Sequence, residues 1–408
     1  MGTHSNGRGS HPPANDSGVY AHIVGWGMAV PERVLTNNDL AAIVETDDTW
    51  IQSRTGIRER RIAGEHESTA TLGLKAAQQA LEVANILPLE LDLIVVATST
   101  PEHIFPSTAS LIQDWLGATK AGAFDLSAAC AGFVYALNMA AQSIRSGSIE
   151  TALVIGSETM SRVLDWQDRS TCILFGDGAG ALVLKASDVE GGVRSAVLRS
   201  DGSGWDLLSI PTVGSRDNRL PEANPDEVKM YKMYMNGREV FKFATRVIGE
   251  SIMQALDMAG LTVNDLSLIV PHQANYRILQ AAARSLNVDE SIFVSNIDRY
   301  GNTSAASIPI ALCEAIEDGR IKDGNHIALC GFGGGLAWAS MIITWTGVET
   351  GEPRALGRQR RQLSYLGARW RRQLVRLSRR ADEVVSRIHP ERGRLSRLRH
   401  KFDKQKLD

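Results

Sequence analysis

The chain has 408 residues, of which 43% are hydrophobic and 22% are charged. This is the composition of an ordinary globular protein, and the length allows two similar-sized domains or one duplicated unit with a large core. No apolar run approaches the roughly 20 residues that span a bilayer, which argues against an integral membrane protein.

The cysteines and the N-terminus indicate the compartment. Four cysteines, none of them in a CxxC pair, argue against a disulfide framework or a zinc site. Residues 1–19 are polar and lack the apolar core of a secretory signal, so we expect a disordered leader. The sequence therefore predicts a cytoplasmic protein without a metal site. The cysteines are Cys130, Cys172, Cys313 and Cys330.

Apolar runs alternate with Ala-rich helical stretches from about Val19 to Trp345. This alternation is typical of a sheet covered by helices on both faces, which is an α/β fold. In chain order, we expect buried strands at 21–24, 93–97, 151–155, 180–184, 268–270, 326–329 and 340–344, and helices at 69–84, 130–146, 238–259, 275–286 and 307–318.

The last 60 or so residues differ in charge and pattern. Residues 348–408 hold 18 Lys and Arg against 7 Asp and Glu, a balance of +11, so residues 1–347 carry −13 of the total of −2. Apolar residues recur there at steps of three and four, which predicts an amphipathic helix that ends before Pro390. The apolar residues are Leu363, Leu366, Trp370, Leu374, Leu377, Ala381, Val384 and Ile388.

Cys130 is the candidate nucleophile. In AFDLSAACAGFVYALNMAAQSI, a short strand runs through small residues into an amphipathic helix, which places Cys130 at or near the helix N-terminus. The helix dipole and the unpaired N–H groups there favour a thiolate. A lone cysteine is more often a buried inert residue, and the other three cysteines keep that interpretation.

Three further features accompany Cys130. His272 in VPHQAN follows a predicted strand, where ligand-binding loops are common. Asn302 in YGNTSAAS precedes a helix, and the run GFGGG at 331–335 could bring backbone N–H groups close to a substrate. Alone, each has a structural interpretation: a buried histidine, a helix cap and a tight turn.

Together these motifs resemble the beta-ketoacyl-[acyl-carrier-protein] synthase III family of thiolase-fold condensing enzymes, over residues 20 to 347. The motifs that agree in order and spacing are TDDTWIQSRTGIRER at 46–60, SAACAGF at 127–133, FGDGAGA at 175–181, HQAN at 272–275, YGNTSAAS at 300–307 and GFGGG at 331–335. FGDGAGA lacks the lysine of a phosphate-binding loop, and we interpret it as close strand packing.

The resemblance implies a five-layered αβαβα thiolase-like fold of two duplicated halves, and a homodimer. The halves would be residues 20–190, with the nucleophile, and 191–347, with the histidine and asparagine. Residues 348–408 would form a basic helical extension. The implied catalytic triad is Cys130, His272 and Asn302, with the backbone N–H groups of Cys130 and Gly334 as the oxyanion hole.

The implied reaction is a decarboxylative Claisen condensation. Cys130 takes an acyl group from an acyl-CoA, and the acyl-enzyme reacts with malonyl-[acyl-carrier-protein] to give 3-oxoacyl-[acyl-carrier-protein], which initiates fatty acid synthesis. His272, through Nε2–H, and Asn302, through its amide, would stabilise the enolate. No cofactor is expected besides the coenzyme A thioester.

The resemblance also implies binding residues. Phe105 would cross the dimer interface and close the partner's acyl pocket. Trp50 and Arg169 would hold the adenine between an aromatic face and a guanidinium. The implied CoA-binding residues are Thr46, Trp50, Arg54, Arg169, Asn236, Gly237, Phe241 and Asn275, and the implied carrier-protein docking residues are Lys242, Gln273, Ala274, Asn275, Tyr276 and Arg277.

Several alternatives remain open at this stage. The enzyme could be a specialised ketosynthase or an acyltransferase of secondary metabolism that uses the same cysteine, and a cysteine hydrolase or an inactive scaffold are weaker rivals. The basic extension could contact an anionic membrane, self-associate, dock a carrier protein or pack against the acidic body. Its sparse aromatics argue against nucleic acid as a partner.

Overall fold

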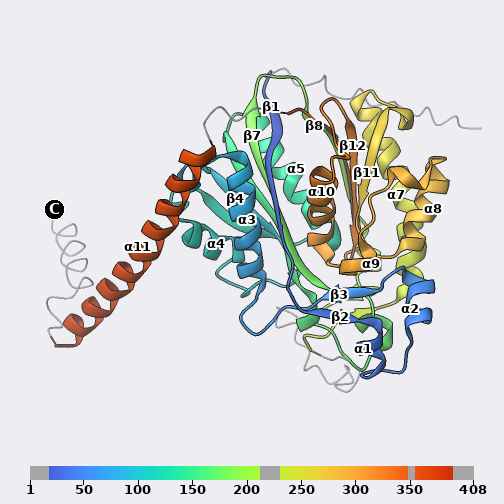
Figure 1. Ribbon diagram of the computed structural model, residues 1–408, viewed down its shortest axis with the longest axis horizontal. Helices are drawn as coiled ribbons and strands as arrows, with labels where there is room; N and C mark the ends of the chain where they lie inside the picture. Colours follow the sequence, from blue (N-terminus) through green and yellow to red (C-terminus); the bar gives the residue numbers. More distant parts are fainter. Residues whose placement is uncertain (1–17, 212–229, 348–353, 389–408) are drawn as a thin grey trace, which may run out of the picture.

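The structure, a computed structural model, describes residues 18–211, 230–347 and 354–388. It has five layers, in which three layers of helices alternate with two sheets (Figure 1). The strands are β1 (Tyr20–Ala29), β2 (Val34–Thr36), β3 (Glu59–Arg61), β4 (Leu93–Ala97), β5 (Gly122–Leu126), β6 (Thr151–Thr159), β7 (Asp177–Ser187), β8 (Gly192–Ser200), β9 (Leu208–Ser209), β10 (Tyr234–Met235), β11 (Leu266–Pro271), β12 (His326–Gly333) and β13 (Ala337–Thr344).

The helices supply the other three layers. The α-helices are α1 (Asn37–Ala41), α2 (Asp48–Thr55), α3 (Thr69–Ala84), α4 (Thr108–Leu116), α5 (Gly132–Arg145), α6 (Arg169–Cys172), α7 (Gly237–Ala259), α8 (Tyr276–Leu286), α9 (Ile297–Tyr300), α10 (Ser307–Glu317) and α11 (Arg354–Ile388). Three short 3₁₀ turns matter for the site: η2 (Ala129–Ala131), η3 (Met160–Arg162) and η7 (Ser304–Ala306).

The two sheets repeat one strand order. The first sheet runs β1-β7-β6-β4-β5 and the second β8-β13-β12-β11. A parallel bridge between Ile269 and Phe293 adds a short segment beside β11, at the position that β5 occupies beside β4. The same path is therefore traced twice, as expected for the duplicated αβαβα fold predicted from the sequence.

The central layer consists of α5 and α10, which pack between the two sheets. Their buried faces are rich in alanine, including Ala136, Ala140 and Ala311. Small side chains let both sheets approach these helices, so one core cluster includes residues from both sheets. Helices α3 and α4 cover the outer face of the first sheet, and α7 covers that of the second.

Most of the predicted elements are confirmed. The predicted helix 69–84 and strand 93–97 match α3 and β4 at both ends. The glycines of FGDGAGA pack closely, because a Cβ on Gly176 would lie 2.4 Å from the Tyr300 carbonyl oxygen and one on Gly180 would lie 2.7 Å from Pro309 Cβ. This confirms the strand-packing interpretation of that motif.

Several elements were not predicted from the sequence, among them strand β8 and helix α4. Strand β8 lies at the edge of its sheet and alternates buried and partly exposed residues, so it lacks the continuous apolar run of a central strand. Helix α4 has only nine residues. In the described part of the chain, no helix is both long enough and apolar enough to cross a membrane.

The predicted amphipathic helix of the C-terminal extension is also present. Helix α11 begins beside α3 and α4 and extends away from the body (Figure 1). Arg358 forms an ion pair with Glu82, and Arg372 Nε lies 3.8 Å from Asp114 Oδ2. The predicted leader lies almost entirely outside the described residues.

Candidate active site

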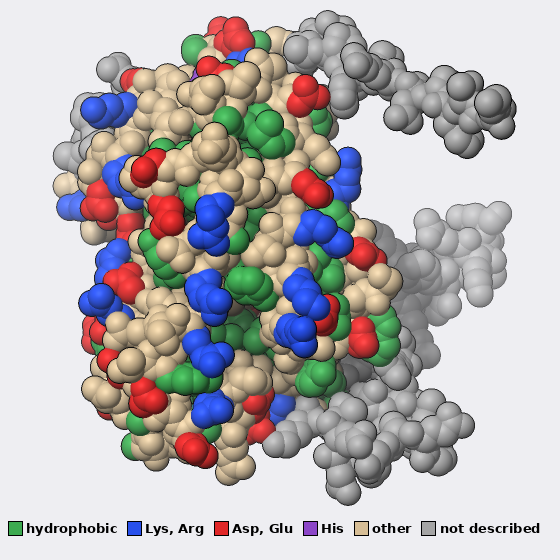
Figure 2. Space-filling view, turned by 90° about the vertical axis from the view of Figure 1, so that its right-hand side faces the viewer, with side chains coloured by type: hydrophobic (Ala, Val, Ile, Leu, Met, Phe, Trp, Pro, Cys, Tyr) green, Lys and Arg blue, Asp and Glu red, His purple; other side chains and the backbone are tan. Residues whose placement is uncertain are grey.

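A cavity of about 1860 Å³ holds all three members of the predicted triad among its lining residues, Cys130, His272 and Asn302. It exceeds the roughly 300–1,000 Å³ of a typical small-molecule pocket, so it can take a long ligand. Figure 2 shows Lys and Arg side chains gathered on the face where α2, α7 and α8 lie. The cationic lining residues include Arg54, Arg162, Arg238, Lys242 and Arg277.

Cys130 lies where the sequence places it, in η2 between β5 and α5. The preceding residue, Ala129, has a φ of 46°, a left-handed conformation that is uncommon for a residue with a side chain. The Cys130 side chain is only 6% exposed, and its Sγ donates a hydrogen bond to Ser304 Oγ at 3.4 Å. A strained backbone therefore presents the sulfur to the serine at the start of η7.

The glycine-rich run packs directly against the nucleophile. A Cβ on Gly333, the last residue of β12, would lie 2.8 Å from the Cys130 backbone nitrogen and 3.2 Å from its Sγ. Gly334, the predicted oxyanion-hole residue, lines the cavity and comes next in the chain. Only glycine at position 333 allows this approach.

His272 follows β11 and is held from two sides. Its backbone N–H donates to the Cys330 carbonyl oxygen at 2.7 Å, and its ring lies edge-to-face on Phe332 with centroids 5.1 Å apart. Ring nitrogen Nδ1 lies 2.6 Å from Ser307 Oγ. These contacts fix the orientation of the imidazole.

The hydrogen bonds of Ser307 select a tautomer of His272. Ser307 has one hydroxyl proton, and its Oγ lies 2.9 Å from the Ser304 carbonyl oxygen, which can only accept. Both contacts of Ser307 are satisfied when its hydroxyl donates to that carbonyl and accepts from His272 Nδ1–H. In this arrangement, Nε2 of His272 carries a lone pair. The prediction from the sequence, in which His272 donates from Nε2–H, requires the other tautomer, with the proton on Nε2 instead of Nδ1.

Asn302 has a fixed amide orientation. Its Oδ1 accepts a hydrogen bond from the Ser304 backbone N–H at 2.8 Å, which leaves Nδ2 as the donor end of the amide. The backbone of Asn302 is also held, because its N–H donates to the Leu174 carbonyl oxygen and its carbonyl accepts from Gly176. Asn302 is therefore a preorganised hydrogen-bond donor.

Ser304 also leads to a buried carboxylate. Its hydroxyl donates to Glu158 Oε1 at 2.9 Å, so a chain of hydrogen bonds runs from the Cys130 thiol through Ser304 to Glu158. Glu158 lies at the end of β6 and also accepts from Thr98, Ser99 and Thr100. Burial raises the pKa of Glu158, and these donors oppose the shift.

The electrostatics of the site favour neutral groups. Burial raises the pKa of the Cys130 thiol to about 12, with a contribution from the Glu158 carboxylate, and burial lowers the pKa of His272 to about 3. The helix start predicted a thiolate from the sequence, whereas burial of the sulfur favours the neutral thiol. The resting pair is a thiol and a neutral imidazole, so the thiol proton must leave as the sulfur attacks.

The predicted adenine-binding residues lie together. The guanidinium groups of Arg54 and Arg169 each lie 4.7 Å from the Trp50 ring centroid. Arg169 Nη1 also donates to the Glu45 carbonyl oxygen at 2.9 Å. A purine between Trp50 and Arg169 therefore requires the arginine to move outward. Thr46 does not line the cavity, and its hydroxyl is buried.

The predicted pantetheine residues differ in their position. Gly237, Phe241 and Asn275 line the cavity, whereas Asn236 does not. Asn236 caps α7, accepting from the Glu239 backbone N–H at 3.3 Å. Asn275 caps α8 and donates from Nδ2 to the Arg54 carbonyl oxygen at 3.0 Å, which ties the two helices that flank the cavity.

The predicted carrier-protein docking residues divide into exposed and buried ones. Lys242, Tyr276 and Arg277 are exposed, and Lys242 forms an ion pair of 2.7 Å with Glu239. Ala274 is partly buried and lines the cavity.

Gln273, also predicted as a docking residue, has a buried side chain. It is 1% exposed, its Nε2 donates to the carbonyl oxygens of Pro271 and Val294, and its Oε1 accepts from the Asn296 backbone N–H. These bonds use its amide to hold the loop after β11, so the side chain is not exposed for docking.

Phe105 is 84% exposed and its neighbour Ile104 is 73% exposed, on the loop before α4. Two adjacent large apolar side chains in water are a typical sign of a contact surface. Ile104 also lines the cavity.

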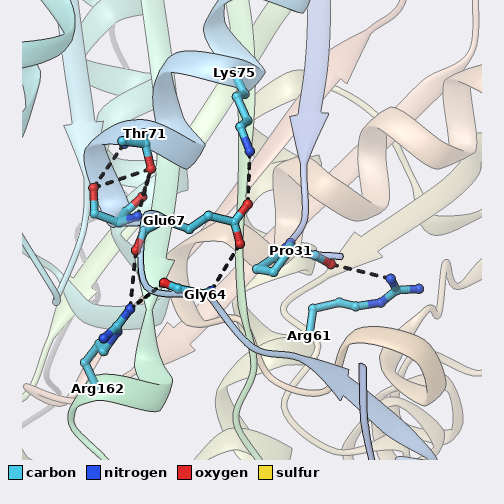
Figure 3. A network of polar contacts seen from close by, with 8 residues as sticks. Pro31, Arg61, Gly64, Glu67, Thr71, Lys75 and Arg162 are labelled. Carbon is cyan, nitrogen blue, oxygen red and sulfur yellow. Dashed lines mark hydrogen bonds and ion pairs between the residues drawn. The ribbon is translucent and has the colours of Figure 1, made fainter. Parts of the chain in front are cut away.

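A polar network holds the loop between β3 and α3, which forms part of the cavity rim (Figure 3). Glu67 forms an ion pair of 2.9 Å with Lys75 on α3 and accepts from the Gly64 backbone N–H. Arg162 of η3 donates to the Gly64 carbonyl oxygen at 2.8 Å. The rim is thus tied to two elements rather than to one.

The residues that connect the triad were not predicted from the sequence. Ser304 and Ser307 lie within the motif YGNTSAAS, and Phe332 lies within GFGGG, but no pattern distinguishes them from their neighbours. Glu158 did carry a signal, since it is a carboxylate at the end of the apolar run TALVIGSET. Such a residue is rarely buried without a specific set of donors.

Comparisons with known proteins place the chain in one family. The family described as 3-oxoacyl-[acyl-carrier-protein (ACP)] synthase III matches residues 124–202, and the C-terminal part of that family matches residues 256–345. A beta-ketoacyl-[acyl-carrier-protein] synthase III from Roseiflexus sp. is 52% identical over 328 residues, which are 80% of this chain and 99% of the relative.

Solved structures give the same result. The 3-oxoacyl-[acyl-carrier-protein] synthase III from Aquifex aeolicus has a TM-score of 0.74 and 45% identity, and covers 80% of this chain and 100% of its own. The corresponding enzyme from Thermus thermophilus has a TM-score of 0.75 and 46% identity, with the same coverage. The chain therefore belongs to the beta-ketoacyl-[acyl-carrier-protein] synthase III family of thiolase-fold condensing enzymes.

Proposed function

We propose that the protein condenses an acyl-CoA primer with malonyl-[acyl-carrier-protein], releasing CO2 and giving a 3-oxoacyl-[acyl-carrier-protein] that starts fatty acid synthesis. The observation that carries this proposal is the linkage through Ser304. Its hydroxyl meets Cys130, its N–H meets Asn302, and its carbonyl meets the serine that binds His272. Ser304 thereby connects the nucleophile with Asn302 and, through Ser307, with His272.

In the first half-reaction, the Cys130 sulfur attacks the carbonyl carbon of the acyl-CoA thioester. His272 Nε2 accepts the thiol proton and passes it to the departing sulfur of coenzyme A. The new bond joins Cys130 Sγ to the acyl carbon, and the bond that breaks is the thioester bond to coenzyme A. The backbone N–H groups of Cys130 and Gly334 stabilise the oxyanion.

In the second half-reaction, the malonyl thioester loses CO2 and negative charge develops on its thioester oxygen. Asn302 Nδ2–H donates to that oxygen, which fits the fixed orientation of its amide. To donate from Nε2 in this step, His272 must be the other tautomer: Nδ1 gives up its proton, Nε2 takes one up from solvent, and the Ser307 hydroxyl turns to donate to Nδ1. We assign this exchange to the interval between the two half-reactions. The carbanion then attacks the acyl carbon and releases the Cys130 sulfur.

The substrates approach from the face shown in Figure 2. Trp50 and Arg54, which line the cavity, and Arg169, which stacks on Trp50, bind the nucleotide of coenzyme A, and Gly237, Phe241 and Asn275 border the pantetheine path. Lys242 and Arg277 are placed to attract an acidic carrier protein. The reaction proposed here uses no metal and no cofactor other than the coenzyme A thioester.

A homodimer in the cytoplasm is the proposed working form. The exposed pair Ile104 and Phe105 supports it, because a second copy would bury this apolar loop next to an acyl pocket. Measuring the molar mass by light scattering tests the dimer, and Phe105→Asp is expected to weaken it. A monomeric wild type would contradict this part of the proposal.

The condensation is tested by incubating the protein with a panel of acyl-CoA primers and malonyl carrier protein. We expect CO2 release that depends on the primer, together with a 3-oxoacyl product on the carrier protein. Acyl transfer without CO2 would instead indicate the alternative, a specialised acyltransferase.

A further inference from the structure

Helix α11 has one face that packs on the body. Arg361 and Ala368 are buried on this face, and Tyr365 packs against the core beneath α3 and α4. Arg361 Nη1 donates to Asn85 Oδ1 at 2.9 Å, and a Cβ on Gly117 would lie 2.9 Å from Ala368 Cβ. Because Gly117 and Ala368 have small side chains or none, α11 can lie close to the C-terminal end of α4.

The opposite face of α11 carries an exposed apolar stripe. Trp370 is 66% exposed and lies two positions from the buried Ala368, which is about 200° around a helix with 3.6 residues per turn. The stripe residues follow one another at helical spacing and are all half-exposed or more. They are Leu363, Leu366, Trp370, Leu374, Leu377 and Val384, which we call the α11 stripe.

Arginines border the α11 stripe on both sides. At 100° per residue, Arg360 and Arg371 lie on one side, and Arg369, Arg376 and Arg380 lie on the other. All five are exposed. The helix as a whole contains 11 arginines and only two acidic residues, Asp382 and Glu383. Its solvent side is therefore an apolar strip between two rows of positive charge.

We propose that the α11 stripe binds the surface of an anionic lipid membrane. A helix with an apolar face, an arginine-rich border and a central tryptophan is suited to lie in the headgroup region, where tryptophan is enriched. Each arginine near an anionic surface adds a favourable contribution. Arginine predominates in both border rows, and the two acidic residues of α11, Asp382 and Glu383, are adjacent and close to its C-terminal end, so this charge pattern disfavours self-pairing along the helix.

The placement of α11 fits such a contact. In Figure 1 the helix extends from the side of the molecule opposite α2 and α8. The α11 stripe is exposed and, by helical spacing, lies opposite the buried Arg361 and Ala368. Residues of α2, α7 and α8, on the other side, line part of the cavity and include its cationic residues Arg54, Arg238, Lys242 and Arg277. A membrane-bound enzyme would thus keep its cavity mouth turned to solution, where carrier protein can reach it.

The test is co-sedimentation of the full chain with vesicles. We expect binding to vesicles of phosphatidylglycerol mixed with phosphatidylcholine and weak binding to vesicles of phosphatidylcholine alone. Binding to the anionic vesicles should be lost in roughly 0.5 M salt, because the salt screens the arginine charges. The triple variant Leu366→Gln, Trp370→Gln, Leu374→Gln should need about tenfold or more lipid for half-binding. Its acylation of Cys130 with soluble acyl-CoA should be unchanged.

A matched control removes exposed apolar surface elsewhere. Leu89→Gln, Met253→Gln, Met258→Gln lie outside α11 and should leave vesicle binding unaltered. A second variant, Arg371→Gln, Arg376→Gln, Arg380→Gln, keeps the apolar side chains and should weaken binding to the anionic vesicles only.

Two results would overturn the proposal. One is equal vesicle binding by the stripe variant and the control. The other is no vesicle binding by the wild type, together with a lower molar mass for the stripe variant in light scattering. The latter would assign the α11 stripe to a second copy of the chain.

Discussion

The hydroxyl of Ser304 accepts a hydrogen bond from the Cys130 thiol at 3.4 Å and donates one to Glu158 Oε1 at 2.9 Å. The nucleophile is therefore connected to a buried carboxylate, although His272 is the residue that sequence patterns point to. The carboxylate disfavours charge on the sulfur, since it contributes to the raised pKa of Cys130. The site thus keeps a thiol until a substrate arrives.

Glu158→Gln should make Cys130 more reactive at a given pH. Removing the negative charge removes one cause of the raised thiol pKa, so the thiolate forms at lower pH. The pH profile of alkylation by iodoacetamide should shift to lower pH. The control is Asp177→Asn, which alters another buried carboxylate that bonds Ala63 and Ser161 rather than Ser304. An unshifted profile for Glu158→Gln would show that its charge does not reach the sulfur.

Ser307→Ala should slow acylation by about tenfold or more, within the range for a misplaced general base. The substitution removes the acceptor that holds His272 Nδ1–H, so Nε2 is no longer fixed as the proton acceptor. Single-turnover acylation, followed by mass, measures the effect. Ser340→Ala, which loses a buried serine pair with Ser251 on the other side of the core, should acylate normally. Equal rates for both variants would argue against the tautomer assignment.

Asn302→Asp should separate the two half-reactions. The aspartate keeps an acceptor for the Ser304 N–H but replaces the Nδ2–H donor with an oxygen, which repels the developing enolate. We expect acylation of Cys130 to persist and CO2 release to fall by about 10²-fold or more, as for a lost oxyanion-hole donor. Parallel assays of the adduct mass and of CO2 check both steps, and a matched loss in the two assays would contradict the assignment.

Gly333→Ala should abolish acylation. The added Cβ would lie 2.8 Å from the Cys130 nitrogen, so β12 or the nucleophile must shift, and about 1 Å of displacement costs roughly 10²-fold in rate. Gly367→Ala is the control, because a Cβ there meets nothing within 4 Å. Near-wild-type acylation by Gly333→Ala would mean that the strand relaxes without moving Cys130.

The sequence predicted the elements that are long and strongly patterned. Helix α3 and strand β4 match at both ends because their apolar periodicity is unbroken. The edge strand β8 and the short helix α4 were missed, because β8 lacks a continuous apolar run and α4 is too short to show a clear helical period. The boundary between the two halves near residue 190 remains a prediction.

The candidate catalytic residues could be named from the sequence, but the hydrogen bonds that connect them could not. Cys130, His272 and Asn302 come from motifs, yet the bonds of Ser304 and Ser307 depend on a backbone turn with a φ of 49° at Ser304. Desolvation is likewise a property of the folded core, which is why the sequence suggested a thiolate and the structure favours a thiol. The amide of Gln273 bonds the backbone of Pro271 and Asn296, and no local sequence pattern predicts these bonds.

The central claim is that Cys130 carries the acyl group between two half-reactions. Intact-mass and peptide analysis of protein mixed with an acyl-CoA should show one acyl group on Cys130 and none on Cys130→Ala. Addition of malonyl carrier protein should then discharge the adduct and yield the 3-oxoacyl product. An adduct on another residue, or an adduct on Cys130 that malonyl carrier protein leaves in place, would contradict the account.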